Sequence, residues 1–147
     1  MLITRIHHFT IRTPMLEKTA YFYEQVIGLI IGQRPSFSFS GVWLYAEGEP
    51  ILHLVYQPIS SSVSDDKLEE YLGKQGTALG SGAIDHISLK GTNLQKMQSH
   101  LSSFKELNFR ERIVPELHEH QIFLEDPNGI TIEVIFPYSL ENTVISG

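Results

Sequence analysis

The chain contains no cysteine. This absence excludes disulfide bonds, thiolate metal ligands and a cysteine nucleophile, and it carries no information about the redox compartment. Basic residues are also scarce: 11 lysines and arginines stand against 17 aspartates and glutamates, which gives a net charge of −6. An acidic chain without a run of basic residues is a poor nucleic-acid binder. We therefore expect no nucleic-acid partner.

Long apolar segments are missing as well. No stretch reaches the roughly 18 apolar residues that a membrane span needs, and the N-terminus lacks the basic and apolar regions of a signal peptide. We therefore expect a cytoplasmic protein with no membrane partner. With 147 residues, of which 41% are hydrophobic and 19% charged, the chain has the size and composition of one globular domain or of two small modules that share a core.

The chain contains an internal repeat. Residues 5–12 (Arg-Ile-His-His-Phe-Thr-Ile-Arg) match residues 83–90 (Ala-Ile-Asp-His-Ile-Ser-Leu-Lys) when His8 is aligned with His86. Apolar and polar residues alternate in both segments, which is typical of a half-buried strand. We predict that His8 lies on the same face as Thr10, that His86 lies on the same face as Ser88, and that the apolar residues occupy the opposite face.

A helix and three further strands are predicted after each of these segments. Apolar residues recur at helical spacing over residues 16–27, with Gly28 as a stop, and over residues 94–104. The further strands are expected at 29–34, 41–46 and 50–57 in the first half, and at 109–114, 120–125 and 130–136 in the second. The sequence thus predicts an α+β protein built from two βαβββ modules.

The expected boundaries follow from these elements. The first module covers residues 1–57 and the second covers residues 83–137. The connection over residues 58–82 is rich in serine and glycine, so we interpret it as an exposed linker or flap, within which residues 65–72 have the pattern of a short helix. Residues 138–147 form a C-terminal tail.

Two ionisable residues interrupt the apolar last strands of the two modules. His53 lies in Ile-Leu-His-Leu-Val, and Glu133 lies in Ile-Thr-Ile-Glu-Val-Ile. A charge in such a strand is costly unless it is paired or bound to metal. Any single strand histidine is more often structural than a ligand, but with His8 and His86 each module repeats the same pair of positions. Imidazole and carboxylate suit Fe, Mn, Ni, Co or Zn, so we predict a divalent metal ion.

Three stretches of the sequence resemble the vicinal oxygen chelate superfamily of glyoxalases, bleomycin-resistance proteins and extradiol dioxygenases. They are Ile-Asp-His-Ile-Ser-Leu at 84–89, Tyr-Phe-Tyr-Glu-Gln-Val-Ile-Gly-Leu at 21–29 and Phe-Leu-Glu-Asp-Pro-Asn-Gly-Ile-Thr-Ile-Glu-Val at 123–134. The resemblance implies curved sheets around a metal cleft, commonly in a homodimer. It places metal ligands at His8, His86 and Glu133, with His53 at the position where four-ligand members carry Glu or Gln.

The resemblance leaves three activities open. The first, which we expect, is a metal-dependent lyase or isomerase resembling glyoxalase I or an epimerase, in which the metal stabilises an enolate-like oxyanion of a small-molecule substrate. Glu133 or His120 would be its catalytic base. The second is an Fe(II) extradiol-type ring-cleaving dioxygenase, in which His120 would manage the catechol proton. The third is a metal-free small-molecule-binding protein resembling the bleomycin-resistance proteins.

Other polar and aromatic residues offer weaker signals. Arg34, Arg110 and Arg112 fall near the outer strands, where one of them could hold a substrate carboxylate, although a solvated arginine is the commoner case. His7 should point away from His8. An aromatic group around residues 35–46 reads as core packing or as the wall of an apolar pocket.

Overall fold

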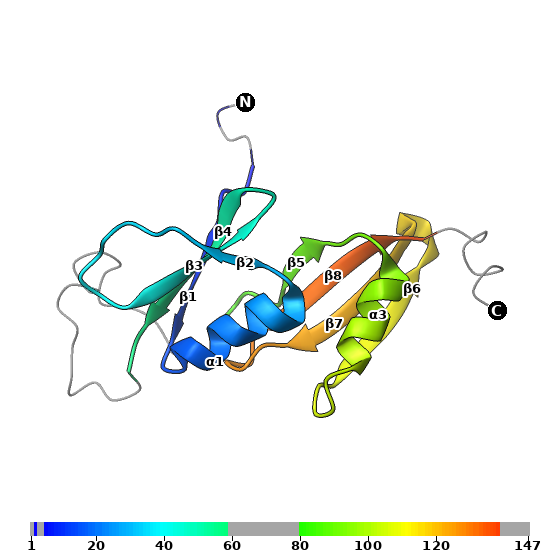
Figure 1. The fold of residues 1–147 in the computed structure, drawn as a ribbon. Coiled ribbons are helices and arrows are strands. Elements are labelled where there is room, and N and C mark those ends of the chain that lie inside the picture. The colour runs from blue at the N-terminus through cyan, green and yellow to red at the C-terminus, as the bar shows by residue number, and fades with distance from the viewer. Residues whose placement is uncertain (1, 3–4, 59–79, 139–147) are drawn as a thin grey trace. The chain divides into compact units, whose positions relative to one another are not determined.

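The computed structural model describes residue 2, residues 5–58 and residues 80–138 (Figure 1). The chain divides into two compact units, Met1–Gly80 and Ser81–Gly147. The helical pattern at 65–72 and the tail after residue 138 lie outside the described residues. In the described ranges, the helices are all too short or too polar to cross a membrane.

The first unit forms a four-stranded sheet with one interrupted helix. Its elements are β1 (Phe9–Thr13), α1 (Leu16–Tyr21), the π-helical segment η1 (Phe22–Ile27), β2 (Ile30–Gly32), β3 (Gly41–Ala46) and β4 (Glu49–Tyr56). The strand order is β1-β4-β3-β2, with β1 parallel to β4 and the other pairs antiparallel. Gly28 ends the helix at φ 95°, a left-handed conformation that favours glycine. The predicted stop at Gly28 is therefore confirmed.

The second unit repeats this topology. Its elements are β5 (Ile87–Lys90), α3 (Leu94–Ser102), β6 (Phe109–Val114), the short 3-10 helix η2 (Pro115–Leu117), β7 (Glu119–Glu125) and β8 (Thr131–Pro137). The strand order is β5-β8-β7-β6, again with the first and last strands of the unit parallel. The predicted α+β fold of two βαβββ modules is confirmed, and the main difference is that the strand expected at 29–34 shortens to β2.

One face of the first sheet carries the apolar core of its unit. Leu44, Leu52 and Leu54 are fully buried, and cross-strand pairing places them on one face of β3 and β4, against which α1 packs. The hydroxyl groups of Thr13 in β1 and Thr19 in α1 lie 3.1 Å apart. The odd-numbered residues of β1 therefore face the helix, and the even-numbered residues, which include Thr10, lie on the opposite face.

The second sheet has the same two-sided construction. Ile132, Val134 and Phe136 of β8 are buried and alternate with residues on the other face. Gln98 of α3 donates a 2.8 Å hydrogen bond to Glu111 of β6, and Figure 1 shows α3 lying along this sheet. The helix covers one face of this sheet. Glu133 lies on the other face, which is available for other contacts.

Candidate functional site

The pairing of first and last strands brings the predicted ligand positions together within each unit. In the first unit Thr10 of β1 is opposite His53 of β4, and in the second unit Ser88 of β5 is opposite Glu133 of β8. His8 and His86 each lie two residues before these partners, just ahead of the first strand. The repeat seen in the sequence is therefore a repeat in register.

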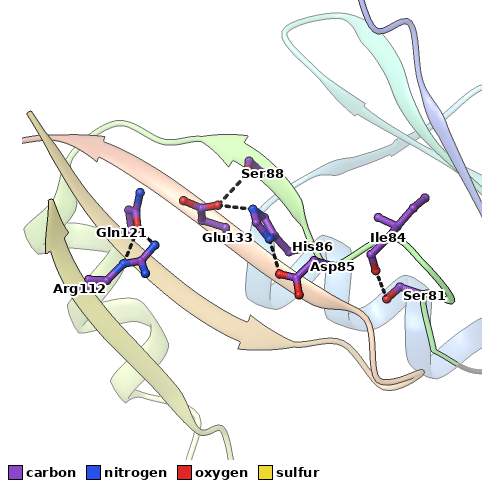
Figure 2. Close-up of polar contacts among 8 residues, drawn as sticks. All are labelled: Ser81, Ile84, Asp85, His86, Ser88, Arg112, Gln121 and Glu133. Atoms are coloured by element: carbon purple, nitrogen blue, oxygen red, sulfur yellow. Dashed lines mark hydrogen bonds and ion pairs between the residues drawn. The ribbon is translucent and has the colours of Figure 1, made fainter. Parts of the chain in front are cut away.

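In the second unit, an imidazole and a buried carboxylate are in direct contact. His86 Nε2 lies 2.8 Å from Oε2 of Glu133, whose side chain is 6% exposed, and Ser88 Oγ donates to the same oxygen at 2.7 Å. Asp85 Oδ2 lies 2.8 Å from His86 Nδ1. Figure 2 shows this chain of contacts running from Asp85 through His86 to Glu133 and Ser88. Two strands and the segment before β5 thus converge on one carboxylate.

The charge state of His86 follows from its partners. The hydrogen bond to Asp85 raises the pKa of His86, as does the negative charge of Glu133, and these effects outweigh the desolvation that lowers it. Both ring nitrogens face carboxylate oxygens, which can only accept. This arrangement therefore favours the protonated imidazole, and a metal ion bound at one ring nitrogen would take the place of its proton.

In the first unit, His53 lies in an aromatic stack. Its ring stacks on Trp43 with a centroid distance of 3.8 Å and an interplanar angle of 4°, and on His8 at 4.0 Å and 19°. Burial, together with the charge of His8, lowers the pKa of His53 to about 4, and a hydrogen bond to the Pro50 carbonyl opposes part of this shift. His53 is consequently neutral at neutral pH.

The same hydrogen bond selects the tautomer of His53. Its Nε2 lies 3.2 Å from the Pro50 carbonyl oxygen, which can only accept, so this nitrogen carries the proton. The lone pair of the neutral ring is then on Nδ1. A neutral imidazole whose second nitrogen donates to a backbone carbonyl is the form in which histidine binds metals.

His7 does not point away from His8 as the sequence analysis expects. The Nδ1 atoms of the two rings are 2.8 Å apart. Both residues precede β1, which begins at Phe9, so the strand alternation that would separate them does not apply. That expectation is wrong, and His7 is a direct neighbour of a candidate ligand.

His120, predicted as a catalytic group, lies on the opposite face of the second sheet from Glu133. His120 pairs with Phe136 across β7 and β8, whereas Phe123 pairs with Glu133. Cross-strand partners share a face and positions three residues apart do not. His120 Nε2 lies 2.8 Å from Glu111 Oε1, on the side of the sheet that α3 contacts. Within this unit the structure therefore does not bring His120 and Glu133 together.

The predicted metal ligands thus form two pairs, His8 with His53 and His86 with Glu133. In the part of the chain that the structure describes, no three histidine or acidic side chains are grouped as a metal-binding cluster. The sequence patterns do not predict the contacts of Asp85 and Ser88. The position of Ser88 in the repeat, matching Thr10, is the signal that could have identified it.

Comparison with known proteins places this chain in a family. The chain belongs to the Glyoxalase/Bleomycin resistance protein/Dioxygenase superfamily, whose model matches residues 5–134. A relative, "Glyoxylase I 4" of Arabidopsis thaliana, is 27% identical over 135 residues, which cover 90% of this chain and 70% of the relative.

Solved structures share the fold at low sequence identity. A lactoylglutathione lyase from Agrobacterium tumefaciens superposes with a TM-score of 0.64 at 17% identity, covering 92% of this chain and 96% of that one. TnmS3, an antibiotic-binding protein from Streptomyces sp. CB03234, superposes with a TM-score of 0.60 at 15% identity, covering 93% and 98%. At these identities the likeness shows the fold, which hosts both enzymes and binding proteins.

Proposed function

We propose that this protein is a divalent-metal-dependent enzyme of the lyase or isomerase type, acting on a small molecule through its carbonyl or hydroxyl oxygens. The observation that carries this proposal is the 2.8 Å contact between His86 and the buried carboxylate of Glu133. A buried ion pair contributes little to the stability of the fold, whereas paired ionisable groups of this kind are common at functional sites. Members of the superfamily typically use divalent metals.

The residues present fit a divalent metal ion. Glu133 supplies a carboxylate held by Ser88, and His86 supplies an imidazole oriented by Asp85 through the ring nitrogen remote from Glu133. An outer carboxylate that fixes a histidine ligand is a recurring feature of metal sites. Nitrogen and oxygen donors of this kind suit Zn, Ni, Co, Mn or Fe.

The first unit offers a second pair of donors. His53 is neutral and presents the lone pair of Nδ1, and His8 stacks on its ring. We therefore propose both pairs, His8 with His53 and His86 with Glu133, as metal ligands, at the positions that the family resemblance implies. When bound, the ion would supply Lewis-acid stabilisation of negative charge on a substrate oxygen.

Proton transfer is the role that this chain's own residues would perform. Glu133 is the base we assign, because its carboxylate is the only acidic group among the candidate ligands. The bonds from Ser88 and His86 both reach Oε2, so they fix the orientation of the carboxyl group. His120 contacts Glu111 on the other face, so it has no part in this assignment.

Metal binding and activity test the proposal together. The protein, purified without a histidine tag and freed of metal, is titrated calorimetrically with Ni²⁺, Zn²⁺, Co²⁺, Mn²⁺ and, without oxygen, Fe²⁺. Each loaded form is assayed with hemithioacetals of 2-oxoaldehydes and with catechols. We expect binding of at least one ion and turnover of a hemithioacetal or a related carbon acid.

A matched pair of variants links the result to the site. Glu133→Ala should abolish activity, whereas Glu116→Ala, which changes an exposed glutamate in η2, should leave it unchanged. Iron-dependent catechol cleavage would instead identify a dioxygenase. Failure to bind any ion, or full activity in Glu133→Ala, would overturn the proposal and favour a metal-free binding protein.

The expected homodimer is part of the proposal. Light scattering coupled to size-exclusion chromatography should give twice the 16.7 kDa mass of the chain. A single-chain mass at micromolar concentration would contradict it.

A further inference from the structure

Two arginines converge on one aromatic ring in the second unit. The guanidinium carbons of Arg110 and Arg112 in β6 lie 4.7 Å and 5.2 Å from the centroid of the Phe123 ring in β7. Phe123 is 7% exposed and is the cross-strand partner of Glu133. Both arginines therefore share the sheet face of the candidate metal ligands.

Within the described residues, neither arginine has a carboxylate partner. Among residues 80–138 as described, no aspartate or glutamate lies within ion-pair distance of either guanidinium group. Because both groups lie about 5 Å from one ring centroid, they are no more than about 10 Å apart. Both residues are exposed, so an anion from solvent can reach the two guanidinium groups.

The guanidinium group of Arg112 is held in place without being neutralised. Its Nε and Nη2 atoms donate to Gln121 Oε1 at 2.9 Å and 2.7 Å. Gln121 is 4% exposed, and its own Nε2 donates to Glu119 at 2.8 Å. Figure 2 shows Arg112 and Gln121 on neighbouring strands, with Glu133 on the next strand. A neutral amide fixes the orientation of Arg112 and leaves its positive charge for a ligand.

The aromatic ring links these cations to the candidate ligands. The rings of Phe123 and His86 meet edge to face at a centroid distance of 6.3 Å. A pocket of about 460 Å³ borders Arg110 and Phe123, a volume that suits a small organic molecule. Its walls also contain the acidic residues Glu106, Glu125 and Asp126, so a ligand's negative charge has to be small and to lie at the guanidinium groups.

We propose that Arg110, Arg112 and Phe123 form a substrate-binding site for a single carboxylate. This inference rests on the proposed function and deepens it, because it names the substrate class. The substrate carries its carboxylate at the two guanidinium groups and its reacting oxygens near His86 and Glu133. Because the ring of Phe123 lies between these two positions, the substrate needs a spacer of about one aromatic ring or a short chain between its carboxylate and its reacting oxygens.

Binding of a matched pair of probes tests this proposal. The probes are 4-acetylbenzoate and its uncharged methyl ester, which have the same ring and ketone. Dissociation constants are measured by NMR titration, first on the metal-free protein and then on the metal-loaded protein. We expect the carboxylate to bind at least about 10-fold more tightly than the ester, as charge-assisted bonds to arginine predict.

Variants identify the residues responsible for the preference for the carboxylate over the ester. Arg110→Gln/Arg112→Gln should remove the preference for the carboxylate, and Arg112→Lys should retain part of it. Arg12→Gln is the matched control, since Arg12 in β1 also donates to a glutamine, Gln57. Metal affinity should be unchanged in all three variants, and thermal unfolding verifies that each is folded.

The outcomes separate this inference from the proposed function. Equal binding of acid and ester, or a preference that survives in the double variant, would overturn the carboxylate site even if metal binds. A carboxylate preference in a protein that binds no metal would support the site and overturn the proposed function alone.

Discussion

The two units carry different chemistry at equivalent positions of one scaffold. In the first unit the partner of the last-strand histidine is Thr10, and in the second the partner of the last-strand glutamate is Ser88. On the neighbouring strand, Trp43 pairs with His53 and Phe123 pairs with Glu133. The backbone register is thus the same, and only the side chains differ.

This difference shows how one backbone register can present two kinds of candidate ligand. The stack of Trp43, His53 and His8 desolvates an imidazole and keeps it neutral. In the second unit, hydrogen bonds from Ser88 and His86 keep a buried carboxylate satisfied. Aromatic surface favours an uncharged donor, and hydrogen-bond donors favour a charged one.

The largest expected effect on stability concerns the aromatic rings. Phe123→Ala should lower the free energy of unfolding by about 3–4 kcal/mol, because a buried ring leaves a cavity. Trp43→Ala should cost about 2 kcal/mol, because Trp43 is only partly buried. Urea unfolding of both variants measures the difference, and equal losses would contradict it.

Substitutions at the two last-strand candidate ligands should reduce metal affinity by different amounts. Glu133→Gln should weaken metal binding by about 100-fold or more, since loss of an outer partner alone costs about 10–100-fold. His53→Gln should weaken it by about 10-fold, because it replaces one neutral donor by another. Calorimetric titration with the tightest-binding ion gives both values. A larger loss in His53→Gln would reverse the assignment of the stronger ligand.

The neutral state of His53 predicts a pH dependence. Its pKa is about 4 in the folded protein against 6.5 in the unfolded chain. The unfolded chain therefore takes up a proton that the folded protein does not, and stability falls as the pH drops from 6.5 to 4. At about 1.4 kcal/mol per pH unit, the full loss is about 3 kcal/mol, and it is absent above pH 6.5.

A variant isolates this contribution. His53→Phe keeps the ring stack and removes the titration, so its unfolding free energy should decline less between pH 6.5 and 4 than that of the unmodified protein. His100→Gln, which changes an exposed helix residue, should follow the unmodified protein. Parallel curves for His53→Phe and the unmodified protein would contradict a neutral, buried His53.

The smallest effect concerns the hydroxyl residues opposite the ligands. Ser88→Ala should cost about 1 kcal/mol, because it removes a hydrogen bond to the buried Glu133. Thr10→Ala changes an exposed side chain and should alter stability by less than about 0.5 kcal/mol. Equal effects in thermal unfolding would mean that the Ser88 bond contributes nothing.

Much of the fold could be predicted because the relevant signals are local. Alternation in 5–12 and 83–90, the stop at Gly28 and the turn sequence after Glu125 each describe a few neighbouring residues. In that turn Asp126 accepts hydrogen bonds from the amides of Asn128 and Ile130, and Gly129 has φ 81°. The faces of His120 and His7 were harder to predict. They depend on where a strand starts and which partner it pairs with, and small shifts change a side chain's direction.

The repeat, the two βαβββ modules and the four candidate ligands follow from local sequence patterns, because periodicity and residue type are local properties. Which groups come into contact depends on the tertiary structure. It joined Ser88 and His86 to Glu133, stacked Trp43 on His53 and placed two arginines over Phe123. These contacts arise between strands that are distant along the chain, so pairing and register create them, and no local pattern encodes them.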